Sequence, residues 1–112
     1  GRLMGLYHST YRAYGFEIPA ATDFDHLDQV LADQPDGERL GRVQRLYLGD
    51  FERLFLLAEC TEVEANTFAR ITAADFARYE LPVWSTVLHN TAVRLGHEVH
   101  PEPAWLLLHD HS

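Results

Sequence analysis

The sequence predicts an α+β fold in which a four-stranded antiparallel sheet carries two helices on one face. Strand-like and helix-like stretches follow one another in the order strand, helix, strand, strand, helix, strand. The chain has 112 residues, of which 46% are hydrophobic and 23% charged. This length and composition suit a single domain with its own core.

The first strand is expected over residues 6–18, where aromatic and β-branched residues are frequent and partly alternate with polar ones. Gly15 marks an expected bulge or bend, and Pro19 ends the strand. Thr22 or Asp23 then caps a helix. Its apolar residues fall on one face at helical spacing: Phe24, Leu27, Val30 and Leu31.

A β-hairpin is expected after the helix breaks at residues 34–37 (Gln-Pro-Asp-Gly). Residues 43–48 and 51–63 predict its strands, and Gly49-Asp50 predicts a tight turn between them. The uninterrupted apolar residues 54–58 predict a strand that is covered on both faces.

The register of this hairpin stays open. A two-residue loop sets Leu46 opposite Arg53, whereas a three-residue loop sets Leu46 opposite Leu54. These alternatives differ by one residue, and such a slip turns every side chain of the strand to the other face.

The second helical region is expected to be kinked or broken near Pro82. Thr72-Ala73-Ala74-Asp75 is a variant capping box, which predicts a helix with Phe76 and Tyr79 on its inner side. Pro82 interrupts that helix and suits the first position of a second segment. Gly96 then predicts the C-terminal end.

A short apolar strand over residues 104–109 completes the order βαββαβ, which is that of the ferredoxin-like sandwich. The sheet face opposite the helices is then wet, covered by a partner or wrapped over a ligand. Four aromatic residues on expected strands favour a covered face: Tyr7, Tyr11, Tyr47 and Trp105. We therefore expect a homodimer that forms through the sheet.

The net charge and the cysteine content limit which classes of partner and which cellular compartment are expected. Seventeen acidic and nine basic residues give a net charge of −8, the wrong sign for direct nucleic-acid binding. A single cysteine, Cys60, excludes an intrachain disulfide, and no long apolar stretch suggests a membrane segment. We expect a cytoplasmic protein. Met4 is the only methionine, so residues 1–3 are expected to be an expression-tag remnant and residues 4–112 the single domain.

Histidines are the most suggestive chemical feature, and four of the seven lie late in the chain: His97, His100, His109 and His111. These two pairs are candidate ligands of one transition metal. The alternative is that they are solvated histidines in a loop and a tail. No His-Glu-x-x-His signature is present, and we expect no native cofactor.

No catalytic residue is assigned. The sequence has no Gly-rich phosphate loop, no Gly-x-Ser-x-Gly elbow and no Cys-x-x-Cys pair. Neighbouring carboxylates of Glu59 and Glu62 are expected to raise the pKa of the Cys60 thiol, so Cys60 is interpreted as a packing residue. His8 is interpreted as a structural histidine of the sheet, because the sequence names no partner that would orient it as a base.

An acidic end of the hairpin is a further expectation. Five carboxylate residues contribute to it: Asp50, Glu52, Glu59, Glu62 and Glu64. Such residues solvate an edge strand or dock a basic protein surface.

The size and element order resemble the dimeric α+β barrel superfamily of small oxygenases and isomerases. That resemblance implies two ferredoxin-like units that close around apolar pockets. Members often carry a Trp several residues before a His, but Trp84 and His89 differ from them in position and spacing, so neither receives a catalytic role. Acylphosphatases share the architecture, but only Val43-Gln44 of their Val-Gln-Gly loop is present, which argues against that family.

The favoured function is a small, acidic, non-catalytic binding or regulatory domain that acts through a protein partner or a small ligand. Two alternatives remain open. One is a small cofactor-independent enzyme of the dimeric α+β barrel type, and the other is a His-rich metal-binding protein.

Overall fold

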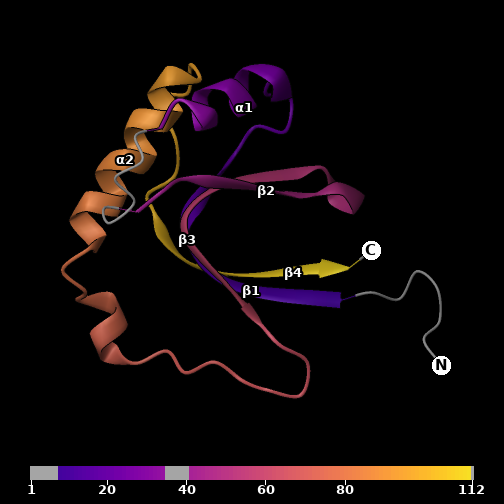
Figure 1. Cartoon of the computed structure of the whole chain (residues 1–112), viewed down its shortest axis with the longest axis vertical. Coiled ribbons are helices and arrows are strands. Elements are labelled where there is room, and N and C mark those ends of the chain that lie inside the picture. Colours follow the sequence, from indigo (N-terminus) through magenta and orange to yellow (C-terminus); the bar gives the residue numbers. More distant parts are fainter. Residues whose placement is uncertain (1–7, 35–40, 112) are drawn as a thin grey trace.

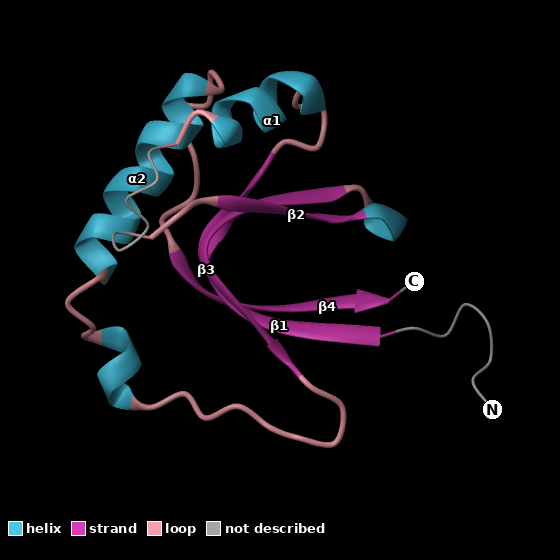
Figure 2. Cartoon of the chain, viewed as in Figure 1, coloured by secondary structure: helices cyan, strands magenta, loops and turns pink. Residues whose placement is uncertain are grey.

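The computed structural model of the chain (Figure 1) describes residues 8–34 and 41–111. Four strands form one sheet in the order β2-β3-β1-β4, and all neighbouring strands are antiparallel. The strands are β1 (His8–Ile18), β2 (Gln44–Leu48), β3 (Arg53–Val63) and β4 (Ala104–His111). The helices are α1 (Phe24–Ala32) and α2 (Leu81–Arg94). Both helices lie on the same side of the sheet (Figure 2), which confirms the predicted α+β class.

The main core lies between the helices and the sheet. Strands β1 and β3 contribute Tyr14, Phe16, Ile18, Leu54 and Leu56, and the helices contribute Leu27, Trp84, Leu88 and Ala92. Helix α1 begins where the sequence predicted it, because the Asp23 carboxylate accepts hydrogen bonds from the N–H groups of Asp25 and His26. At the C-terminal end of α2, Gly96 adopts a φ of +88°, a conformation that suits glycine.

A bulge at Gly15 bends the middle of the sheet, as its sequence position suggested. Tyr14 pairs with Glu59 whereas Gly15 pairs with Leu57, so Ala58 has no partner on β1. The two strands approach so closely here that a Cβ on Gly15 would lie 1.9 Å from the Leu56 carbonyl oxygen. Only glycine fits such a contact, and a bulge increases the local twist.

A second core cluster fills the sheet face that carries no helix. Its buried members are Ala13, Phe55, Leu57 and Leu108, and Tyr11, Leu46, Leu48, Cys60 and Leu106 pack against them. Residues of all four strands therefore meet on this face, because the bent sheet is concave there (Figure 1). The expectation that residues 54–58 are covered on both faces is confirmed.

The aromatic residues that favoured a covered second face are divided between the two faces. Tyr47 packs edge-on against Phe24, and Trp105 packs against Trp84, so both lie on the helix side. Tyr11 lies on the helix-free face. Tyr7 lies outside the described residues.

Neither expected register of the hairpin is correct. Leu46 pairs with Phe55, and Leu48 pairs with Arg53. The connection is longer than a tight turn because Gly49–Phe51 form a 3-10 turn and Glu52 adopts a left-handed conformation with a φ of 52°. The sequence analysis left a two-residue and a three-residue loop open, but four residues separate the strands.

The prediction of a helix that begins after Thr72 is also wrong. Only a 3-10 turn forms, η3 (Ala73–Phe76), and Phe76 and Tyr79 are 64% and 86% exposed rather than packed inside. The indole N–H of Trp105 donates to the Asp75 carbonyl oxygen, an acceptor that a continuing α-helix would need. Pro82 is the second residue of α2, whereas the sequence predicted the first, and the expected break of the helical region lies before α2.

Gln34 joins the end of α1 to the start of β2. Its side-chain amide donates to the Val43 carbonyl oxygen and accepts from the Val43 N–H, both at 2.7 Å. We expect Gln34→Ala to lower the free energy of unfolding by about 1–3 kcal/mol, because the buried Val43 would lose both partners. Urea denaturation measures this. Gln29→Ala, on the exposed side of α1, is the matched control, and an equal loss in both variants would contradict the role of Gln34.

Candidate functional site

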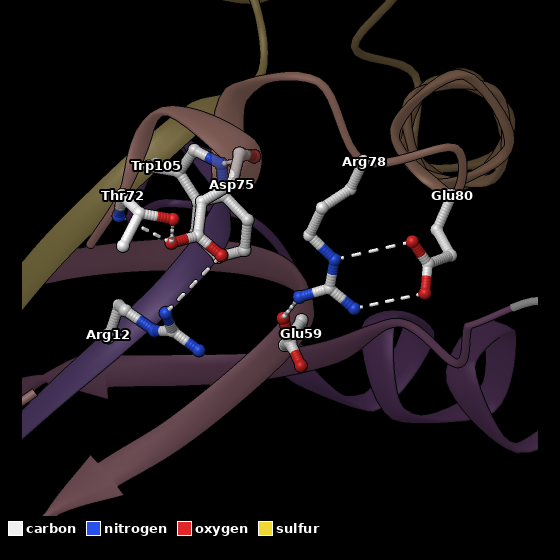
Figure 3. Close-up of polar contacts among 7 residues, drawn as sticks. All are labelled: Arg12, Glu59, Thr72, Asp75, Arg78, Glu80 and Trp105. Carbon is white, nitrogen blue, oxygen red and sulfur yellow. Dashed lines mark hydrogen bonds and ion pairs between the residues drawn. The ribbon is translucent and has the colours of Figure 1, made fainter. Parts of the chain in front are cut away.

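The segment that connects β3 to α2 is fixed against the helix side of the sheet (Figure 3). The indole Nε1–H of Trp105 donates to the Asp75 carbonyl oxygen at 2.8 Å. The carboxylate of Asp75 accepts a hydrogen bond from the Thr72 N–H, also at 2.8 Å. The reciprocal bond of the predicted capping box therefore serves to hold a turn beside β4 rather than to start a helix.

Arg78 continues this network and uses most of its hydrogen-bonding capacity. Its guanidinium donates to both carboxylate oxygens of Glu80, at 3.2 and 3.0 Å, and to Glu59 at 3.1 Å. It also lies over the ring of Trp84, with Cζ 4.8 Å from the ring centroid. The hydrogen bond from Arg78 lowers the pKa of Glu80, and the same bond together with nearby carboxylates raises the pKa of Arg78. Arg78 is thus a structural cross-link between the segment and β3.

Arg12 of β1 has a similar setting but far fewer partners. Its side chain is 17% exposed, its Cζ lies 5.2 Å from the centroid of Trp105, and its closest carboxylate oxygen, on Asp75, is 3.9 Å away. In residues 8–34 and 41–111 no acceptor forms a hydrogen bond with the Arg12 guanidinium. Figure 3 shows the contrast, with one contact to Arg12 and three to Arg78. A guanidinium has five N–H donors, so Arg12 retains donors for a further acceptor.

A surface cavity of about 280 Å³ adjoins Arg12. Its other lining residues belong to the end of β3 and the start of the connecting segment: Thr61, Glu62, Val63, Glu64, Thr67, Phe68, Ala69 and Arg70. The lining combines two arginines (Arg12 and Arg70) and two glutamates (Glu62 and Glu64) with apolar and hydroxyl side chains. Such a combination of a charged anchor and apolar walls is typical of a small-molecule site.

A second cavity, of about 370 Å³, lies beside the ring of Trp105. It is lined by Tyr14, Phe76, Leu81, Pro103, Ala104 and Trp105. The hydroxyl group of Tyr14 is already paired with the Ser85 hydroxyl at 3.0 Å. This cavity therefore supplies apolar surface, and the charged anchor lies with Arg12.

The late histidines are separated by the structure. His97 bonds to the Thr22 hydroxyl, His100 bonds to His89, and His109 bonds to His8. His100 precedes β4 whereas His109 lies near its far end, so the two candidate pairs do not meet. The side chain of His111 lies outside the described part of the chain. Among the described residues, no group of three or more His, Cys, Asp or Glu is placed to hold a metal ion.

The pKa of the Cys60 thiol is raised, which confirms the direction expected from the sequence. Burial is the larger cause, and the carboxylates of Glu59 and Glu62 add to it. Cys60 packs against the helix-free core cluster. A partly buried thiol with a raised pKa is a poor nucleophile.

The expected acidic end of the hairpin does not form. Glu52 precedes β3 and Glu64 follows it, so the 11 residues of that strand lie between them, which is roughly 40 Å along the strand at about 3.3 Å per residue. The Glu59 carboxylate forms an ion pair with Arg78. The acidic residues of the hairpin are therefore distributed along it.

Sequence reasoning missed the four residues that organise the site: Arg12, Asp75, Arg78 and Trp105. One signal for Arg12 was available. In a strand, alternate residues share a face, so Arg12 shares a face with Tyr14 and Phe16, which are core residues. A charged residue in line with core residues on a central strand is a candidate functional group.

The chain matches no protein-family model, no curated protein and no solved structure. Within the described residues, none of the helices is both long and apolar enough to span a bilayer.

Proposed function

We propose that the chain is a non-catalytic binding domain whose ligand is a small carboxylate held by Arg12. One observation carries this proposal: the Arg12 side chain is 17% exposed and lines a cavity, yet within the described residues it makes no hydrogen bond and its nearest carboxylate oxygen, on Asp75, is 3.9 Å away. Burial of a charged group that is not hydrogen-bonded is unfavourable. A bound carboxylate would supply the missing acceptors, and two parallel N–H···O bonds suit the geometry of both groups.

The position of Arg12 is largely set before a ligand binds. The ring of Trp105 supports one side of the guanidinium, and the Asp75 carboxylate lies near one nitrogen. Asp75 is itself held by Thr72, and Trp105 is held by its bond to the Asp75 backbone. Preorganisation of this kind reduces the entropy that binding costs.

A ligand with one negative charge fits better than a polyphosphate. The whole chain carries a net charge of −8, and Glu62 and Glu64 also line the cavity. Repulsion therefore increases with each further negative charge on the ligand. Val63, Phe68 and Ala69 offer apolar contacts, so we expect an aromatic or aliphatic monocarboxylate.

The order of elements and of strands supports a further proposal, that the architecture is the ferredoxin-like sandwich. Dimerisation through the helix-free face, a protein partner with a basic surface and a cytoplasmic location stay predictions.

Benzoate is a suitable probe for the Arg12 site. In titrations followed by amide NMR, we expect benzoate to shift the resonances of Arg12, Thr61 and Thr67. Arg12→Gln should weaken the binding at least about tenfold, because a charge-assisted hydrogen bond contributes about 1.5–3 kcal/mol. Inorganic phosphate should bind more weakly than benzoate.

Arg53→Gln is the matched control. Arg53 lies on β3, is 57% exposed and pairs with Glu17 at 3.1 Å, away from the cavity. Its removal should leave benzoate binding unchanged. Arg12→Lys retains the positive charge and most of the aliphatic part of the side chain but lacks the planar guanidinium. This variant therefore distinguishes an effect of losing the guanidinium from an effect of unfolding. Equal binding of benzoate by the wild-type protein and Arg12→Gln would overturn the proposal.

A further inference from the structure

We propose that the outer edge of β3 over residues 58–63 binds a basic peptide in an extended conformation, which adds to the sheet as a further strand. Strand β3 has 11 residues, but β2 pairs only with residues 53–57 of it. Beyond residue 57, the described part of the chain places no strand on that side of β3 (Figure 1). We call this side of residues 58–63 the free edge. The proposal does not rest on the carboxylate site at Arg12.

Strand β2 begins only at Gln44 because the residue before it bonds elsewhere. Gln44 pairs with Leu57, so a longer β2 would place Val43 beside Ala58. Instead, the side-chain amide of Gln34 donates to the Val43 carbonyl oxygen and accepts from the Val43 N–H, both at 2.7 Å. The backbone groups that would extend the ladder along β3 are therefore used by Gln34.

The chain before β2 turns towards the helices. Val43 belongs to the core on the helix side, and Gly41 approaches Trp84 of α2 so closely that a Cβ on Gly41 would lie 2.4 Å from Cδ1 of the indole. A cavity of about 340 Å³ lies where this part of the chain separates from β3, and its lining includes Ala58, Glu59 and Cys60. The first residues of the free edge are thus open to a ligand.

The free edge presents backbone groups that lack a partner strand. In an antiparallel strand, alternate residues direct both N–H and C=O to the same side. Residues 59–63 pair with β1 on one side only, so every second one directs these groups outward. Among the described residues, no backbone–backbone hydrogen bond from outside the sheet reaches residues 58–63. An extended peptide supplies the complementary row of donors and acceptors.

The charges along the free edge favour a basic peptide. Glu59 pairs with Arg78. Glu62 and Glu64 are exposed, and in residues 8–34 and 41–111 neither of them forms an ion pair. The net charge of −8 disfavours pairing of this edge with a second copy of the chain, and it attracts a positively charged peptide.

The alternation of β3 indicates which peptide side chains fit. Cys60 packs in the helix-free cluster, so Cys60 and Glu62 share that side of the sheet, whereas Thr61 and Val63 lie on the helix side. Side chains of neighbouring strands on the same side contact one another. A basic residue therefore suits the position beside Glu62, and β-branched residues suit the positions beside Thr61 and Val63. The fitting sequence alternates basic and β-branched residues.

The test uses the full chain and the peptide acetyl-Val-Lys-Val-Lys-Val-Lys-amide, followed by amide NMR and hydrogen exchange. We expect the exchange of alternate amides in residues 58–63 to slow by about tenfold when nine-tenths of the protein is bound. The same peptide with Glu in place of Lys should bind at least about tenfold more weakly. Glu62→Gln should weaken binding of the Lys peptide by up to about fivefold, the range of one exposed ion pair.

Two controls separate strand addition from general charge attraction. Glu98→Gln removes an exposed carboxylate in the loop after α2 and should leave the affinity unchanged. Two N-methylated peptides, one methylated at every Val and the other at every Lys, each lose the N–H groups of one edge. Only the peptide that keeps the N–H groups facing β3 should bind as the parent does.

Three results would overturn the proposal. The first is that the Lys peptide gives no protection of amides in residues 58–63. The second is equal binding of both N-methylated peptides, which would exclude backbone pairing. The third is equal affinity for the Lys and Glu peptides, which would exclude selection by charge.

Discussion

Gly15→Ala is expected to lower the free energy of unfolding by at least about 3 kcal/mol, and this loss would leave little net stability in a domain of this size. The added methyl group would lie 1.9 Å from the Leu56 carbonyl oxygen. That atom belongs to the backbone of a central strand, so it cannot move aside as a flexible side chain can. Relief of the contact requires separation of β1 from β3 beside the bulge, where both core clusters are joined.

Gly49→Ala provides the matched control for this change. A Cβ at Gly49 would meet only the Tyr47 ring, at 3.5 and 3.8 Å, which is ordinary van der Waals contact. Its effect should lie within about 1 kcal/mol, because alanine reduces the entropy of the unfolded chain. Urea denaturation followed by circular dichroism measures both variants. A Gly15→Ala protein as stable as Gly49→Ala would show that the strands do not approach as closely as described.

The elements of the fold were predictable because their signals are local. Asp23 supplies a cap for α1, Pro82 fits only the first turn of a helix, and Gly96 ends α2. The element order then predicted the four-stranded antiparallel sheet. Gly15 was also correctly interpreted as a bulge, since glycine inside a strand pattern has few other uses.

The errors occurred where distant contacts decide the outcome. The capping box at Thr72 is present, but Trp105, 30 residues beyond Asp75, takes the carbonyl oxygen that a helix would use. The hairpin register depends on Glu52, whose left-handed backbone is unusual for a residue other than glycine, asparagine or aspartate. Neither effect is visible in the residues that carry the local pattern.

The candidate site was harder to predict than the fold for the same reason. Arg12 and Arg78 look alike in the sequence, and both lie over a tryptophan ring in the structure. They differ only in that Glu59 and Glu80 satisfy Arg78, whereas the nearest carboxylate to Arg12 is 3.9 Å away. That difference depends on the path of the segment between β3 and α2, where the sequence predicted a helix. His89 and His100, which form a hydrogen bond, likewise come from separate parts of the chain, whereas the sequence analysis paired each late histidine with its neighbour in the chain.

The helix-free face of the sheet changes the argument for a homodimer. The sequence analysis expected a second copy because four aromatic residues on expected strands favoured a covered face over a bare one. In the structure, Ala13 and Leu57 are fully buried on this face and Leu108 is 5% exposed. The bend of the sheet at Gly15 brings side chains of the edge strands towards one another, so one chain already removes much of this surface from water.

Leu57→Ala is therefore expected to lower the free energy of unfolding by about 2–5 kcal/mol, the range for a fully buried leucine, and the loss should not depend on protein concentration. Leu107→Ala, on the edge strand β4 at 65% exposure, is the matched control and should cost less than about 1 kcal/mol. Urea denaturation at two protein concentrations that differ a hundredfold separates the two accounts of this face. If the sheet buries Leu57 by itself, the transition midpoints of wild type and variant stay constant. If a second copy buries it, both midpoints rise with concentration, because association stabilises the folded state by mass action. A small, concentration-dependent loss in Leu57→Ala would thus favour the dimer over the self-covered sheet.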